Sequence, residues 1–309
     1  MADEVFKDVD DARDSITKRQ KREIRKYYNQ WAREIKANAL QYSKMGPEYV
    51  GYSRELTQLY YQLRQSSKVL TAEINSTIRT GMSDLSDVAI RTNKRWLRSL
   101  GFTESSIDTK FSHSKDIAIR NLISGNLYQN GFSLSTRIWD IENNTMKDIY
   151  AVVTKGIAEK KSVYQISLEL EKYVKPDARL PWYTTSVEII GGNKRPVIIH
   201  NRQVDYNAQR LARTLLQHCY QQSLVELTKD NPFVKGYLWH ASGGHACELC
   251  QSRDSNIYTP EDLPLDHPNG QCTIEVLVDE EKIKSDIEGF MDNPILYPDI
   301  QRFGLKLEL

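Results

Sequence analysis

The sequence predicts an α+β protein that is mostly α-helical. Its N-terminal half is long and helical, its middle is helical with one β-hairpin, and a small β module lies near the C-terminus. Three observations support this class. Apolar residues recur every three or four positions over most of the first 175 residues. Two β-branched runs flank Gly191-Gly192-Asn193, and three of the four cysteines lie within twenty-six residues of one another.

Composition narrows the possible classes of protein. A length of 309 residues allows one to three domains. Four cysteines are too few for a disulfide scaffold, and no apolar run reaches the roughly eighteen residues of a membrane span. The acidic N-terminus lacks the apolar stretch of a secretory signal, so we expect a reducing compartment in which thiols serve as ligands. The net charge of +1 favours neither a nucleic-acid partner nor its absence.

Residues 1–130 form the predicted helical N-terminal region. Its first fourteen residues are acidic and indicate a mobile arm, and residues 18–36 form a basic helix with one apolar face. Further helices are expected from about Ser53 to Arg79, from Asp84 to Leu100 and from Ser114 to Tyr128.

Residues 131–232 form the predicted helical core. It begins with a helix over Ser133–Lys155, and Ser162 with Gln165 is a capping box that opens the next helix. The run from Ser186 to His200 is the hairpin, 186–200, and a long helix from Asp205 to about Leu227 follows. Cys219 lies on the apolar side of that helix, where a packed core cysteine is expected.

Residues 233–280 form the predicted β module, and residues 281–309 form an acidic C-terminal tail. Short strands over Lys235–Ala241 and Thr273–Val278 flank the cysteine cluster. So small a module buries too little apolar surface to be stable alone, and a bound metal ion would supply the missing stability.

The spacing of the clustered cysteines is typical of a zinc site. Cys247 and Cys250 form one ligand pair on a tight turn, and His267 and Cys272 form the second. Three sulfurs and one imidazole are a standard structural set for one Zn²⁺ per chain and leave no open position. The alternative is three cysteines that lie close together without a metal. His245 is a less suitable ligand because it stands only two positions before Cys247.

The basic helix is the candidate contact for DNA, although most charged helical faces are simply solvated. The bases nearest its N-terminal end are Lys18, Arg19, Lys21, Arg22, Arg25 and Lys26. No nucleophile elbow or paired acids indicate an enzyme. A metal-dependent nuclease acting on DNA stays as an alternative, because Asp266-His267-Pro268-Asn269 is similar to the start of a His-Asn-His nuclease motif. No histidine follows His267 to complete that motif.

Several motifs in a fixed order resemble the phage head morphogenesis family, the minor head proteins of the Mu F-like and SPP1-like kind. They are Ala212-Arg213-Thr214 in a helix, Trp239 in a strand, Cys247-x-x-Cys250 followed by Asp254, and His267-Pro268-Asn269-x-x-Cys272. The resemblance covers about residues 130–278. Two departures are Gly270-Gln271, where the family often has Cys-Arg, and Glu248-Leu249, which replaces a pair that usually contains proline.

The resemblance implies a non-enzymatic structural protein of a tailed bacteriophage. Such minor capsid proteins associate with the portal protein or with capsid or scaffold proteins, and they assist head assembly, DNA packaging or DNA delivery. The expected location is the virion, in the head interior or at the portal vertex, and the host cytoplasm during assembly. The basic residues of the first helix would then face either DNA or the portal.

Overall fold

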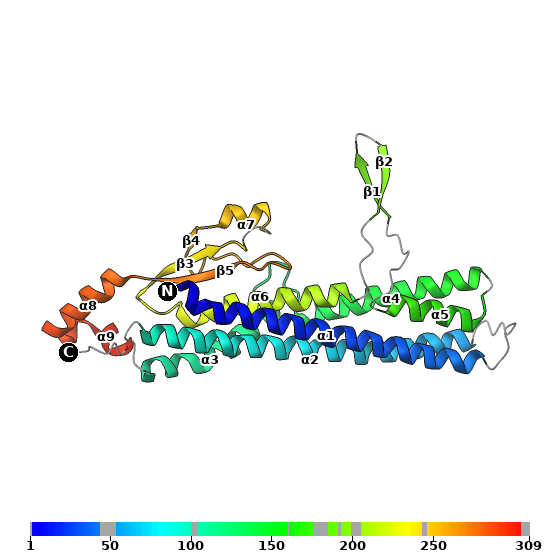
Figure 1. The fold of residues 1–309 in the computed structure, drawn as a ribbon, viewed down its shortest axis with the longest axis horizontal. Helices are drawn as coiled ribbons and strands as arrows, with labels where there is room; N and C mark the ends of the chain where they lie inside the picture. The colour runs from blue at the N-terminus through cyan, green and yellow to red at the C-terminus, as the bar shows by residue number, and fades with distance from the viewer. Residues whose placement is uncertain are drawn as a thin grey trace. The chain divides into compact units, whose positions relative to one another are not determined.

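The computed structural model describes residues 2–43, 54–99, 104–159, 161–175, 185–190, 193–198, 205–242 and 246–303 (Figure 1). Over these residues the chain is a mostly helical α+β protein with nine α-helices. A three-stranded antiparallel sheet near the C-terminus lies with the cluster of cysteines and histidine. The predicted fold class is therefore confirmed.

Contacts divide the chain into two units that do not follow chain order. Unit 1 comprises Met1–Gln20, Ile78–Leu134 and Arg210–Leu309, and unit 2 comprises Lys21–Thr77 and Ser135–Gln209. The helices α1, α2 and α6 each contribute residues to both units. The four-part division of the sequence follows chain order instead, and it stays a prediction.

The first two helices are longer than the sequence pattern indicates. Helix α1 spans Ala2–Ser43 and therefore includes the acidic stretch that was expected to be an arm. Val9 is buried there because it continues the apolar spacing of the helix toward the N-terminus. Helix α2 spans Arg54–Ser99 without the expected interruption. A Cβ atom at Gly81 would lie 2.0 Å from the Gln20 side chain, so this glycine permits close helix packing in unit 1.

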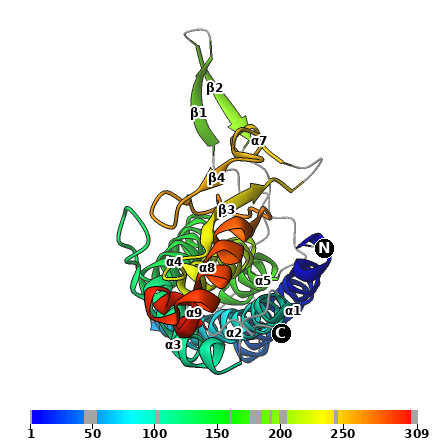
Figure 2. The ribbon, with the colours of Figure 1, turned by 90° about the vertical axis from the view of Figure 1, so that its left-hand side faces the viewer.

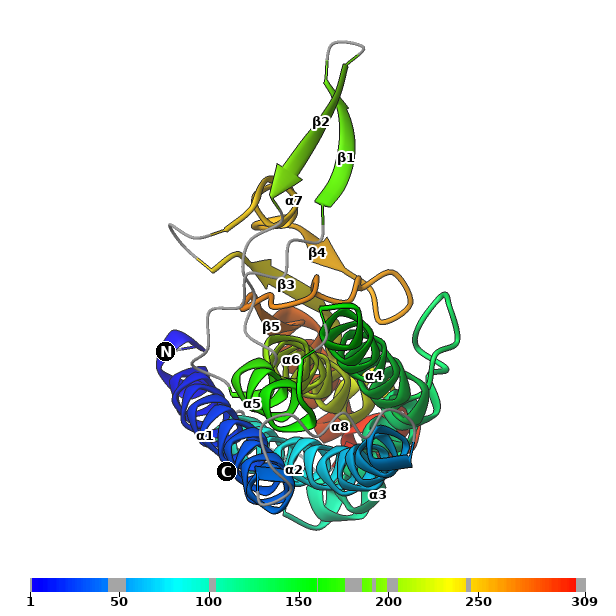
Figure 3. The ribbon, with the colours of Figure 1, turned by 90° about the vertical axis from the view of Figure 1, so that its right-hand side faces the viewer.

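Three helices follow, and two of them belong to unit 2 almost entirely. They are α3 (Glu104–Ser124), α4 (Leu134–Ala158) and α5 (Val163–Val174). The predicted capping box is confirmed, because the Ser162 Oγ atom accepts from the Gln165 amide while the Gln165 side chain accepts from the Ser162 amide. Helices α4 and α5 lie side by side (Figure 3), and the Tyr173 hydroxyl donates to the Asp148 carboxylate at 2.6 Å.

The predicted hairpin is confirmed. Strands β1 (Thr185–Ile190) and β2 (Asn193–Ile198) pair antiparallel, with Thr185 opposite Ile198 and Ile190 opposite Asn193. The predicted turn residues Gly191 and Gly192, and the last two positions of the 186–200 segment, lie outside the described residues.

The last part of unit 1 combines one helix with the three-stranded sheet. Helix α6 spans Tyr206–Thr228, and the sheet contains β3 (Val234–His240), β4 (Ile257–Tyr258) and β5 (Thr273–Val278) in the order β4-β3-β5. Trp239, Tyr237 and Ile274 are buried in the core of this unit. The short helix α7 (Glu248–Arg253) carries the first cysteine pair.

The acidic C-terminal segment is mostly helical over its described residues. It contains α8 (Glu280–Asp292), a 3₁₀ turn η2 (Pro294–Leu296) and α9 (Pro298–Phe303). Helices α8 and α9 lie next to each other (Figure 2). Ile283 and Ile300 are buried in the unit 1 core, and this apolar side explains why an acidic sequence orders here. Within the described ranges, no helix is both long and apolar enough to span a bilayer.

Candidate metal centre

The four predicted ligands meet beside the sheet, together with one carboxylate. Ligand atoms of Cys247, Cys250 and His267 all lie within 4.8 Å of one another, and so do those of Cys250, Asp266 and Cys272. The two groups share Cys250. Together these side chains form a cluster that could hold a metal ion.

The cluster is open to solvent on one side and buried on the other. Cys250 and Cys272 are buried with 1% and 0% of their surface exposed, whereas Cys247 is exposed and His267 is half-buried. Burial raises the pKa of the Cys250 thiol well above its ordinary value, and its neighbours Cys272 and Cys247 act in the same direction. A hydrogen bond from the Cys250 backbone lowers the pKa of the Cys247 thiol.

The donor set fits a thiolate-binding cation. Thiols crowded at one point resist ionisation because their negative charges would repel one another, and a divalent ion between them reverses that cost. Nδ1 of His267 lies 3.1 Å from the Pro268 carbonyl oxygen. A proton donated there leaves Nε2 with the lone pair that a metal requires.

Several bonds hold α7 against the sheet. Cys247 is the N-cap residue of α7 and Cys250 lies one turn later, so both sulfurs belong to a single turn. Asp254 ends the helix, and its carboxylate accepts from the Ala241 amide at 2.7 Å. The Arg253 guanidinium lies 5.2 Å from the centre of the Trp239 ring and donates to the Leu265 carbonyl oxygen. The strand tryptophan and the cysteine turn are therefore fixed to each other.

The loop that carries the second ligand pair is organised by Asp266. Its carboxylate accepts from the backbone amides of His267 at 2.8 Å and of Cys272 at 3.0 Å. Its Oδ1 atom also lies 3.9 Å from the Cys250 Sγ atom. Asp266 is buried, with 3% of its surface exposed.

Helix α6 is the platform on which this loop lies. Successive residues in the middle of this helix bond to the loop. Arg213 Nε donates to the Asn269 Oδ1 atom at 3.0 Å, and the Thr214 hydroxyl accepts from the Asn269 amide at 3.2 Å. The Gln217 side chain donates to the Cys272 carbonyl oxygen.

The next residues along the same side of α6 continue the pattern. His218 Nε2 donates to the Asp266 carbonyl oxygen at 2.8 Å, and the Gln221 Oε1 atom accepts from the Asp266 amide at 3.0 Å. The Tyr220 hydroxyl donates to the Ile274 carbonyl oxygen at 3.0 Å.

The sequence interpretation named Arg213 and Thr214 as motif residues but missed Gln217, His218 and Gln221. His218 belongs to no ligand spacing, and only the apolar side of its helix was assigned to the core. The polar residues Thr214, Gln217, His218 and Gln221 recur at steps of three and four and are all buried. Such a buried polar face on a helix was the available signal, because buried polar groups require fixed partners.

Cys219 lies apart from the metal cluster, in agreement with its expected core position. It is buried, and its Sγ atom lies 3.1 Å from the Ser86 hydroxyl. Burial raises the pKa of its thiol to about 11. His245, the less suitable ligand, lies outside the described residues.

The basic residues of α1 differ in their surroundings. Lys18, Lys21, Arg22 and Lys26 are exposed, and Arg25 is half-buried. Arg19 is paired with the Asp84 carboxylate of α2. A phosphate contact by this helix stays a prediction.

Within unit 2, bases of two helices meet at one hollow. Arg33 and Lys36 of α1 and Lys175 at the end of α5 line a hollow of about 430 Å³, and Glu171 is the acidic residue in its lining. Arg22 and Lys26 lie on the same face of α1 as Arg33, at steps of four and seven residues. We call Arg22, Lys26, Arg33, Lys36 and Lys175, all within the described part of unit 2, the basic stripe.

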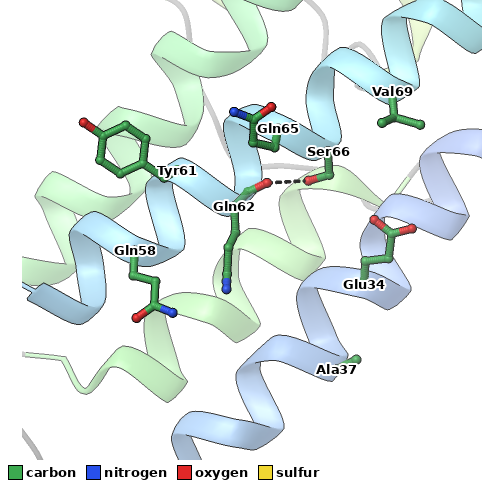
Figure 4. A pocket seen from close by; sticks show the side chains of 8 residues that line it. All are labelled: Glu34, Ala37, Gln58, Tyr61, Gln62, Gln65, Ser66 and Val69. Carbon is green, nitrogen blue, oxygen red and sulfur yellow. Dashed lines mark hydrogen bonds between the residues drawn. The ribbon is translucent and has the colours of Figure 1, made fainter.

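A larger hollow of unit 2 lies between α1 and α2 (Figure 4). It measures about 720 Å³ and is lined mainly by amide and apolar side chains, among them Gln58, Gln65 and Val69. Ser66 accepts from the Trp31 indole at 2.8 Å and donates to the Gln62 carbonyl oxygen at 2.9 Å. Among the described residues of this lining, Glu34 is the only charged one.

Comparisons of the chain with protein-family models, with curated proteins and with solved structures find no match.

Proposed function

We propose that the protein is a structural minor head protein of a tailed bacteriophage, which associates with the portal or the inner capsid and assists head assembly, DNA packaging or DNA delivery. One observation supports this most. The motifs that carry the resemblance to the head morphogenesis family meet at a single place, because Arg213 and Thr214 bond directly to Asn269 beside His267. Motifs that are separate in the sequence thus act as one structural unit.

The metal centre of this protein is proposed to be structural. Cys247, Cys250, His267 and Cys272 would hold one Zn²⁺ per chain, because three sulfurs and one nitrogen are a preferred set for zinc. Four protein ligands leave no open position for a substrate or an activated water. The ion would therefore join α7 to the loop before β5, and its contribution would be to folding.

Exposed aromatic residues support a role in assembly. Trp139 and Tyr150 of α4 are 58% and 62% exposed and lie eleven residues apart, on one helix face. Large aromatic side chains are enriched at protein interfaces because they bury much area with little loss of entropy. We assign this face to contact with a portal, capsid or scaffold protein.

The test of the assembly role is co-purification with the portal protein of the phage that encodes this chain. We expect the two proteins to co-purify after co-expression, and we expect the chain in purified virions by mass spectrometry. A Trp139→Ala, Tyr150→Ala double variant should weaken the complex at least tenfold while keeping its helicity. Absence from virions, together with no portal, capsid or scaffold binding, would contradict the proposal.

The basic stripe supports a second contact, with DNA. Its exposed bases would neutralise phosphates, so affinity should fall steeply with salt. An Arg33→Glu, Lys36→Glu variant should bind DNA roughly ten- to a hundredfold more weakly and with a shallower salt dependence. The matched control is Lys68→Glu, Lys147→Glu, which changes the same charge at exposed positions of other helices. Equal binding by both variants would exclude the stripe.

A plasmid assay separates these roles from the nuclease alternative. We expect no nicking of supercoiled DNA in the presence of Mg²⁺, Mn²⁺ or Zn²⁺. Nicking that is abolished by His267→Ala would favour the nuclease instead.

A further inference from the structure

We propose that Asp266 is the positioning residue of the metal centre: it is not a ligand itself, but it sets where His267 and Cys272 stand and connects them to α6. The inference rests on the proposed zinc site. It assigns a role to a residue that no ligand spacing identifies.

The carboxylate of Asp266 bridges the two ligand residues of its loop. One oxygen accepts from the His267 amide and the other from the Cys272 amide. These two bonds close the four positions between His267 and Cys272 into a compact loop, and both ligand side chains project from the residues that are bonded. Loss of either bond would release the backbone at a ligand.

The backbone of Asp266 is fixed in turn by α6. Its amide donates to Gln221 and its carbonyl oxygen accepts from His218, and both of these side chains are buried. The imidazole of His218 is oriented by the Tyr128 hydroxyl, which lies 2.9 Å from Nδ1. Asp266 therefore has polar partners on its carboxylate, its amide and its carbonyl group.

Gly270 leaves the space that the Asp266 carboxylate occupies. A Cβ atom at position 270 would lie 2.1 Å from the Asp266 carboxylate atoms, well inside contact distance. The departure from the family pattern at Gly270 therefore has a local reason, because a side chain there would displace the bridging carboxylate.

Two considerations favour the positioning role over direct ligation. Both carboxylate oxygens already accept backbone N–H groups of the ligand residues, which is the arrangement of a group that orients ligands from behind. Three thiolates and one carboxylate would also place four negative charges around a divalent ion, whereas His267 supplies a neutral nitrogen. Hydrogen-bonded residues behind the ligands commonly orient them and raise metal affinity.

The experiment measures Zn²⁺ affinity by competition with a chromophoric chelator, and the absorption spectrum of the Co²⁺-substituted protein. Asp266→Asn keeps the shape of the side chain but can accept only with one oxygen, and its amide nitrogen would face an N–H donor. We expect affinity to fall roughly 10- to 100-fold. The sulfur-to-cobalt bands should keep their wild-type position and intensity, because the three thiolates and the imidazole still bind.

Two further variants keep the test independent of folding. Asp279→Asn is the matched control, because the Asp279 carboxylate also accepts a backbone amide, that of Lys282 at 2.9 Å, but it caps α8 and belongs to neither ligand group. It should bind Zn²⁺ as the wild type does. Gly270→Ala, which displaces the carboxylate while keeping Asp266, should reproduce the loss of affinity with the metal-free circular dichroism unchanged.

Wild-type affinity in both Asp266→Asn and Gly270→Ala would overturn the positioning role and leave the zinc site standing. A changed cobalt spectrum in Asp266→Asn would instead make Asp266 a ligand and would equally overturn it. Failure of the wild-type protein to bind Zn²⁺ would overturn the zinc site itself.

Discussion

The β module around the cysteines and the helices of unit 2 are stabilised in different ways. In the module, a few side chains with particular chemistry converge, and Cys250 alone belongs to both ligand groups. In unit 2, stability is spread over many buried apolar side chains, of which Ile149, Leu170 and Tyr173 are examples. From this difference we expect that replacing a single ligand atom destabilises the module strongly. In the helices of unit 2, the loss of stability should instead depend on how much buried apolar volume a substitution removes.

The largest effect should come from Cys250→Ser, which tests whether single ligand atoms stabilise the β module. Structural Zn²⁺ contributes on the order of 10–16 kcal/mol through four ligands, so loss of the shared sulfur should cost several kcal/mol. Bound zinc should fall from one per chain to nearly none. Cys219→Ser is the matched control, because Cys219 is buried beside Ser86 and lies in neither ligand group. Retention of zinc by Cys250→Ser would break the comparison.

Leu170→Ala tests whether buried apolar side chains stabilise unit 2. Leu170 of α5 is fully buried, and truncation should lower the free energy of unfolding by about 2–5 kcal/mol, measured by urea denaturation. Zinc content should stay at the wild-type level. Val69→Ala removes apolar carbon at a site that is 61% exposed and should change stability by only a few tenths of a kcal/mol. Equal losses in the two variants would mean that burial in unit 2 is not what stabilises it.

Cys219, the cysteine without a proposed ligand role, should make the free energy of unfolding depend on pH in the alkaline range. Its pKa in the folded protein is about 11, against an ordinary value of 9.0. Between these values the unfolded chain loses the proton while the folded chain keeps it, so stability falls as pH rises. The full loss is roughly 2–3 kcal/mol. The free energy of unfolding of Cys219→Ser should lack this component, and a constant difference between the two proteins from pH 8 to 11 would contradict it.

The smallest effect is expected at the start of α5. Ser162→Ala removes the side-chain bond that caps this helix and should cost about 1 kcal/mol in the free energy of unfolding. Ser162→Thr keeps a hydroxyl acceptor and should lie within a few tenths of a kcal/mol of the wild type. A cost as large as that of Leu170→Ala would show that one cap, and not shared packing, decides the stability of this helix.

Local patterns in the sequence predict most of the fold. The capping box at Ser162, the hairpin pairing and strand β5 follow from residues that are neighbours in the chain. Helix lengths are less predictable, because they depend on partners. Val9 lies in an acidic stretch and Gly81 is a glycine inside a helix, so the helix at either position is explained only by the packing of α1 on α2 within unit 1.

The candidate site divides in the same way. Spacing alone identifies Cys247, Cys250, His267 and Cys272, because ligand pairs on turns have fixed separations. The role of Asp266 could not be predicted, since its partners His218 and Gln221 lie 48 and 45 residues away in the chain. The role of a buried polar side chain is known only once its hydrogen-bond partner is known.

The central claim is that one zinc ion holds the β module together, and metal content is its most direct test. Protein purified without chelators and analysed for its elements should contain one zinc per chain. A content well below one zinc per chain would contradict the account.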